Sequence, residues 1–123
     1  MAAALIQAPV RDEVQAQPWL NRRAAVRHPI GPVTKGRMAE GASFRFRRAR
    51  IQDISFGGIA LLTRQQLPVG TPVWIQLTNE ILGITYDLSA RVAHATRKAR
   101  DSWVIGCAFT RTLTEPELES LLY

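Results

Sequence analysis

Residues 84–111, ITYDLSARVAHATRKARDSWVIGCAFTR, carry the clearest indication of the fold. Apolar and polar residues alternate along 84–97, which is the period of a strand with one buried face. Residues 98–102 are charged and turn-like, and residues 103–111 alternate again. The stretch therefore predicts two long antiparallel strands joined by a short charged hairpin turn.

Shorter stretches of the same kind lie before this hairpin. We expect strands at residues 43–53, 59–62 and 73–77. A further stretch from Pro29 is interrupted by glycine and proline, so it would be an edge strand or a bulged one. About six antiparallel strands with frequent turn signals favour a small closed β-barrel or a sandwich over a helical fold.

The expected strand at 43–53 is rich in aromatic residues and arginine. Phe44 and Phe46 would share one face of it. Arg47 and Arg48 break the alternation, so we expect a β-bulge at that point. The dense arginines of this strand are most simply a solvated sheet face; a ligand wall or a partner surface is the alternative.

The last segment predicts a helix from about residue 114. Thr114 can serve as N-cap, and Glu117 completes a capping box. Pro116 falls in the first turn, where proline is tolerated. Three leucines then form an apolar stripe, so the helix would cover one barrel opening or pack on the barrel side.

The bulk properties indicate one domain, with 46% hydrophobic residues in 123. Residues 1–21 show no sustained period and are expected to form a flexible N-terminal arm, leaving 22–123 as the domain. No apolar run reaches the length of a membrane span, and Met1–Ile6 is too short for a signal-peptide core. Cys107 is the single cysteine, which agrees with a reducing compartment. We therefore expect a cytoplasmic protein.

The charge balance is basic, with a formal net charge of +6. Of the 16 basic residues only Lys35 and Lys98 are lysine. Arginine suits fixed bidentate contacts, although a high arginine share also follows from a GC-rich genome. A basic balance attracts nucleotides, nucleic acid or anionic membranes and does not choose among them.

Two short segments carry chemistry that suits an anionic guanine nucleotide. The first, residues 22–27, supplies arginine forks that can hold phosphates and guanine edges. In the second, Asp53 and Ser55 would share one face of a strand, with Ile54 in the core. A carboxylate can accept from a guanine edge. Gly57 and Gly58 allow positive φ and a close backbone approach.

This pair of segments resembles the PilZ domain, the bacterial receptor module for the second messenger cyclic di-GMP. The marks of that family are an R-x-x-x-R segment and a D/N-x-S-x-x-G segment. Arg23 and Arg27 fit the first, and Asp53, Ser55 and Gly58 fit the second. The resemblance implies a six-stranded barrel followed by a C-terminal helix.

The resemblance covers roughly residues 22–113 and implies a role for each motif residue. Arg23 and Arg27 would grip phosphate and guanine, and the Asp53 and Ser55 side chains would bind the guanine edge. Gly58, with Gly57 before it, would shape the turn. Arg22 occupies a position linked in the family to a stacked pair of ligands, so we lean to a pair.

The function expected from this resemblance is a non-catalytic receptor and adaptor. Ligand would order residues 22–27 against the barrel and change a surface read by an unidentified effector in motility, polysaccharide or regulatory pathways. The alternatives are a single-stranded nucleic-acid binder, which thin aromatic content disfavours, and a degenerate PilZ interaction module.

The same residues also allow interpretations that involve no ligand. The arginines of residues 22–27 can be a solvated linker, and Asp53 with Ser55 can merely close a turn. His94 has no neighbours at metal-ligand spacing, so no metal and no cofactor are expected. Cys107 is expected to be buried core rather than a nucleophile, and no catalytic group is assigned.

Overall fold

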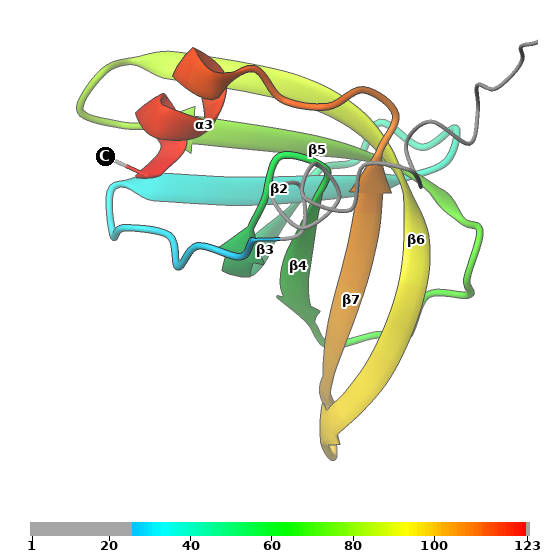
Figure 1. Cartoon of the computed structure of the whole chain (residues 1–123). Helices are drawn as coiled ribbons and strands as arrows, with labels where there is room; N and C mark the ends of the chain where they lie inside the picture. Colours follow the sequence, from blue (N-terminus) through cyan, green and yellow to red (C-terminus); the bar gives the residue numbers. More distant parts are fainter. Residues whose placement is uncertain (1–25, 123) are drawn as a thin grey trace, which may run out of the picture.

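The computed structural model describes residues 26–122, whose strands close into one antiparallel barrel (Figure 1). The elements are β2 (Thr34–Glu40), β3 (Arg47–Ile54), β4 (Gly58–Thr63), β5 (Pro72–Asn79), β6 (Ile84–Ala99), β7 (Ser102–Phe109) and α3 (Glu115–Leu122). Around the barrel the strand order is β2-β3-β4-β7-β6-β5. Within the described part of the chain, this confirms the predicted six-stranded barrel with a C-terminal helix.

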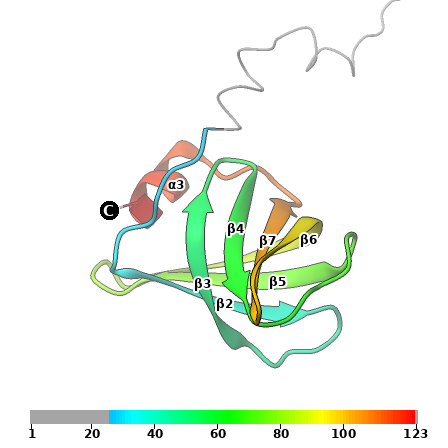
Figure 2. The same cartoon turned by 90° about the horizontal axis from the view of Figure 1, so that it is seen from below.

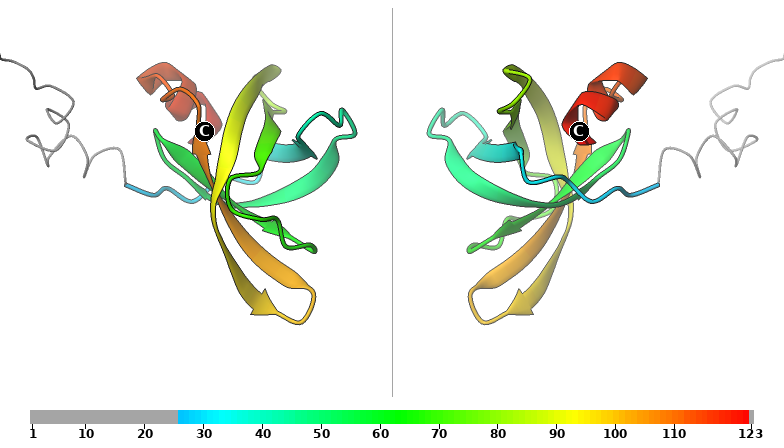
Figure 3. Two further views of the ribbon diagram at one scale, coloured as in Figure 1. Left: turned by 90° about the vertical axis from the view of Figure 1, so that its right-hand side faces the viewer. Right: turned by 90° about the vertical axis from the view of Figure 1, so that its left-hand side faces the viewer.

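The long hairpin expected at residues 84–111 is formed by β6 and β7. One face of β6 is buried as the alternation predicts, up to Val92: Leu88, Ala90 and Val92 are each 2% exposed. Beyond that point the two strands continue together past the barrel wall and project from it (Figure 3). The hairpin therefore supplies part of the barrel and an exposed arm.

β2 has a neighbour on both sides, so the expectation of an edge strand is wrong. It pairs with β3 through residues 36–38 and with β5 over its full length, from Thr34 opposite Asn79 to Glu40 opposite Val73. Gly36 helps this strand to pass close to β3, because a Cβ there would lie 2.9 Å from the Ala49 carbonyl oxygen. Closure removes the edge that an open sheet would leave.

β3 begins later than the sequence pattern suggests. Ser43 and its neighbours form a loop, because the Ser43 amide bonds the Glu40 carbonyl and the Ser43 hydroxyl accepts from the Arg45 amide. These local bonds compete with a strand ladder. Phe44 is consequently 78% exposed in this loop, so the predicted aromatic strand face is wrong there.

A β-bulge lies between Ile51 and Asp53, with Gln52 as the extra residue, and not at Arg47–Arg48 as expected. Without it, the alternation that turns Ile51 inward would bury Asp53 and expose Ile54. With it, Ile54 is fully buried, as predicted, and the Asp53 side chain is 24% exposed. The bulge therefore places a carboxylate on the outside of the barrel wall.

The helix α3 lies across one end of the barrel (Figures 1 and 2). Its residues Leu118 and Leu121 belong to the same buried core as the strand interiors. Its last carbonyls, which lack partners within the helix, accept from the barrel: Thr34 Oγ1 donates to Leu121 O at 2.8 Å and Asn79 Nδ2 to Ser120 O at 2.7 Å. Packing and these bonds together fix the helix on the barrel.

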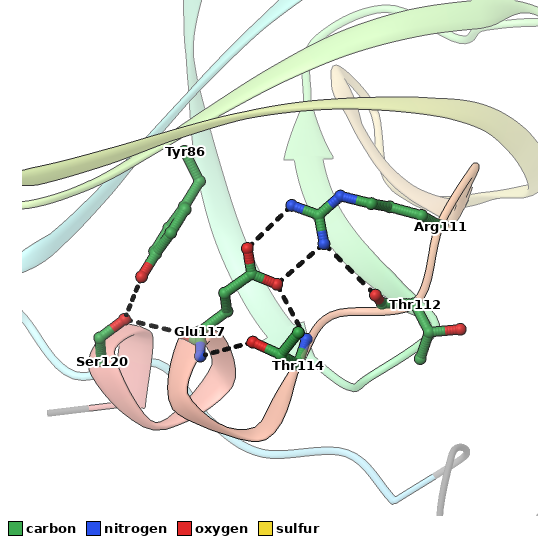
Figure 4. Close-up of polar contacts among 6 residues, drawn as sticks. All are labelled: Tyr86, Arg111, Thr112, Thr114, Glu117 and Ser120. Atoms are coloured by element: carbon green, nitrogen blue, oxygen red, sulfur yellow. Dashed lines mark hydrogen bonds and ion pairs between the residues drawn. The ribbon is translucent and has the colours of Figure 1, made fainter.

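The start of α3 is the predicted capping box (Figure 4). The Thr114 amide donates to Glu117 Oε1 at 2.8 Å, and the Glu117 amide donates to Thr114 Oγ1 at 3.3 Å. Arg111 adds a bidentate pair, with both nitrogens 2.8 Å from the Glu117 carboxylate. Tyr86 and Ser120 hydroxyls lie 2.9 Å apart and tie the next turn to β6.

The two glycines of the turn after β3 have different roles. A Cβ on Gly58 would lie 2.5 Å from the Cys107 carbonyl oxygen, whereas one on Gly57 would meet nothing within 4 Å. Neither has positive φ, which is found at Gly41, Gly70 and Gly83 among the described glycines. The expected close approach is therefore present at Gly58, and the expected use of positive φ is wrong.

Gly58→Ala should lower the melting temperature, because the added methyl group would overlap backbone that cannot move freely; we expect a loss of about 1–3 kcal/mol. Gly57→Ala is the matched control and should melt close to the parent protein. Thermal unfolding followed by circular dichroism measures both. Equal melting temperatures for the two variants would contradict the close approach of β4 and β7.

The stability of the barrel end should depend on pH through Glu117. The hydrogen bond from Arg111, followed by that from the Thr114 amide, lowers the pKa of Glu117 from 4.5 to about 2. The ionised carboxylate therefore stabilises the folded state fully above about pH 4.5, and this contribution is lost as pH falls toward 2. In denaturant unfolding, the stability difference between parent and Glu117→Gln should shrink across that window. A difference independent of pH would count against this assignment.

Candidate functional site

The chain before β2 is attached to the end of β3 by its backbone. The His28 amide donates to Ile54 O at 2.8 Å, and the Ile54 amide donates to His28 O at 2.9 Å. This isolated antiparallel bridge continues the sheet by one residue pair. It brings Arg27, from the first motif segment, to the strand that carries Asp53, from the second.

Arg27 and Asp53 form an ion pair on the outer wall of the barrel. Arg27 Nη1 lies 3.2 Å from Asp53 Oδ1, and the side chains are 43% and 24% exposed. Oδ1 itself is shielded from solvent and accepts no hydrogen bond of good geometry from the described residues. The nearby Arg27 guanidinium thus compensates the charge of Asp53, while Oδ1 accepts no hydrogen bond from the described residues. An ion pair this exposed contributes little to stability, about 0–1 kcal/mol.

Ser55 lies just beyond the end of β3 and is 3% exposed. Its amide donates to Gly58 O at 2.8 Å, and its hydroxyl approaches the same carbonyl oxygen at 3.3 Å. In this structure the Ser55 side chain closes the turn. Ser55 thus has the turn-closing role that the sequence left open as the alternative to ligand binding.

The same turn is also bonded to the segment that leads into α3. Gly57 O accepts from the Phe109 amide at 2.8 Å, and Phe56 O accepts from the Leu113 amide at 2.9 Å. Residues 55–58 therefore contact β7 and the connection between β7 and α3 directly. Two backbone bonds thus connect this turn to the end of β7 and to Leu113, two residues before α3 begins.

Strand register places Asp53 in a row with Ala60, Gly106 and His94, one residue from each of four neighbouring strands. The row faces outward, because the residues on either side of Ala60 and of Gly106 belong to the buried core. A Cβ on Gly106 would collide with the His94 imidazole, so this ring lies over the glycine. The row has a carboxylate at one end, an imidazole at the other and small residues between.

His94 is the residue of this row that sequence reasoning missed. Its partners come from three other strands, and the register of β6 with β7 shifts between Val92 and His94. No spacing in the chain reveals such a row; only the pairing of all four strands does. Arg22 and Arg23, the other motif arginines, lie outside the described residues.

The described residues contain no candidate metal site and no activated thiol. No group of three or more His, Cys, Asp and Glu side chains among them could hold a metal ion. Burial raises the pKa of the Cys107 thiol to about 11, so it is protonated at neutral pH and acts as core, as expected. Within residues 26–122 no helix has both the length and the apolar character needed to cross a membrane.

Comparison with solved structures shows a similar fold. The chain resembles the Bacillus subtilis inhibitor of motility, MotI/DgrA, with a TM-score of 0.56 and 16% sequence identity. The alignment covers 79% of this chain and 46% of that one, so this chain spans less than half of its length. No curated protein sequence matches the chain.

The sequence also matches the family model described as the PilZ domain, over residues 21–123. The match includes both motif segments, the six strands described above and the terminal helix. The chain therefore belongs to the PilZ domain family.

Proposed function

We propose that this protein is a non-catalytic, cytoplasmic receptor for cyclic di-GMP that acts as an adaptor. PilZ domains form a family of cyclic di-GMP receptors and adaptors, which supports the class of function. The observation that carries the proposal for this chain is the Arg27–Asp53 ion pair. Residues from the two motif segments, 26 positions apart, meet there on the outer wall of the barrel.

In the proposed complex this ion pair is exchanged for contacts with ligand. Asp53, with its unused acceptor, takes the N1 and N2 donors of a guanine. Arg27, together with Arg22 and Arg23, turns to the phosphates and to guanine O6 and N7. Because the exposed pair is worth little, the exchange costs little.

The row of small residues provides the surface on which a base can lie. Ala60 carries only a methyl group beside Asp53, and the His94 imidazole covers Gly106. Strand spacing places Asp53 about 10 Å from Gly106 at the Cα positions, so a base bound at Asp53 would reach the His94 ring that covers Gly106. His94 then offers an aromatic face at the far end of the row.

The output of binding would be a changed surface read by an effector protein. The turn at residues 55–58 is bonded to the segment before α3, so a contact at Asp53 has a direct structural route to the helix. A nucleic-acid binder and a PilZ module that has lost its ligand are the competing functions. The ion pair between the two motif segments, with Ala60 and the His94 ring beside it, favours retained ligand binding.

Isothermal titration calorimetry with cyclic di-GMP tests the proposal. Arg27→Ala and Asp53→Ala should each weaken binding by about tenfold or more, because each removes a charge-assisted contact. Asp101→Ala, an exposed carboxylate in the turn of the hairpin, is the matched control and should bind normally. Both site variants should melt near the parent temperature.

Absence of heat with the folded parent protein would reject cyclic di-GMP as ligand. Binding that persists unchanged in both site variants would reject the site while leaving the ligand in place. The same titration reports stoichiometry. Two ligands for each chain in the parent protein and one in Arg22→Ala would support a stacked pair.

His94→Ala tests the row separately. Loss of a stacking surface should weaken cyclic di-GMP binding by about tenfold. Thr96→Ala, two residues further along β6 and also exposed, serves as control. Equal affinities of the two variants would show that ligand does not extend along the row to β6.

A further inference from the structure

A second charged surface lies on the outer wall of the barrel, on β2 and β3. Four exposed cations surround the buried pair formed by Gly36 and Ala49. These cations, which we call the β2–β3 basic face, are Lys35, Arg37, Arg48 and Arg50. The function proposed above uses none of them.

The arrangement of this face is unfavourable for the protein by itself. Arg37 and Arg48 are directly opposite in the register of β2 with β3, and like charges in that position destabilise a sheet. Among the described residues, no carboxylate lies within ion-pair distance of any of the four cations. Within residues 26–122 the face therefore carries positive charge that has no counter-charge beside it.

The surroundings of the face indicate what kind of partner fits. Trp74 of β5 is 40% exposed, and it lies diagonally across from Arg37, since Arg37 is opposite Gln76. Asp87 of β6 is exposed opposite Gln76, and Glu40 is exposed at the end of β2. The four cations therefore have an exposed tryptophan beside them on β5, with carboxylates at the end of β2 and on β6.

We propose that the β2–β3 basic face docks an acidic patch on a partner protein. Arginine and tryptophan are the residues that dominate protein interfaces. A compact acidic patch can pair with the four cations and place its own basic rim against Glu40 and Asp87. A nucleic-acid strand carries negative charge along its whole length, and would meet the two carboxylates as it left the face.

The face is separate from the ligand site, although both include β3. Arg48 is five residues from Asp53, about 16 Å along the strand, and the row of Asp53 runs away from it across β4, β7 and β6. The docking proposal can therefore be tested without cyclic di-GMP. Failure of one proposal leaves the other standing.

The test uses fluorescence anisotropy of a labelled oligoglutamate peptide with the full chain at about 0.15 M ionic strength, where the Debye length is about 8 Å. Arg48→Glu should weaken peptide binding by about tenfold or more. The same substitution places a carboxylate opposite Arg37, so its melting temperature should rise by about 1–5 °C. Binding and stability are thus expected to change in opposite directions.

Arg97→Glu is the matched control, because it makes the same change of charge on the projecting β6–β7 hairpin, across the barrel ring from β2 and β3 (Figure 3). It should alter peptide affinity by less than about twofold. The double variant Arg37→Gln/Arg48→Gln provides a second, uncharged test and should also lose binding.

Two results would overturn the proposal. Equal losses in Arg48→Glu and Arg97→Glu would show that peptide affinity reports net charge alone. A single-stranded oligonucleotide whose affinity depends on Arg48 more strongly than that of the peptide would assign the face to nucleic acid instead.

Discussion

The β-bulge at Gln52 determines which side of the barrel wall each later residue of β3 occupies. One inserted residue returns Ile54 to the core and turns Asp53 outward. A strand without it would bury the carboxylate, whose desolvation is costly, and would expose an isoleucine. Both the packing at this end of the barrel and the candidate ligand site depend on that single shift of register.

Barrel closure places the rest of the site around Asp53. The backbone bridge between His28 and Ile54 brings Arg27 to the carboxylate. The order β3-β4-β7-β6 then sets His94 at the far end of the same row. Each contact is weak or local, and the rigid wall of the barrel holds the groups in their positions.

The two outer surfaces of the barrel differ in how their charges are compensated. At the candidate ligand site Arg27 faces Asp53, so positive charge is held in an ion pair that ligand would replace in the proposed complex. On β2 and β3, Arg37 faces Arg48, and the described residues supply no counter-charge. The Arg27–Asp53 surface is suited to exchanging its ion pair for contacts with a ligand. The β2–β3 basic face is suited to docking an acidic surface of a partner protein. Both surfaces include residues of β3.

The sequence by itself determined the local elements of this protein. The strand alternation, which the structure confirms from Ile84 to Val92, the hairpin turn and the capping box of Thr114 with Glu117 depend on neighbours within a few positions. The tertiary structure alone decided where the bulge lies, that β2 has no free edge and which residues share the row with Asp53. These features depend on pairing between strands far apart in the chain, and a register shift of one residue reverses the face of every side chain after it.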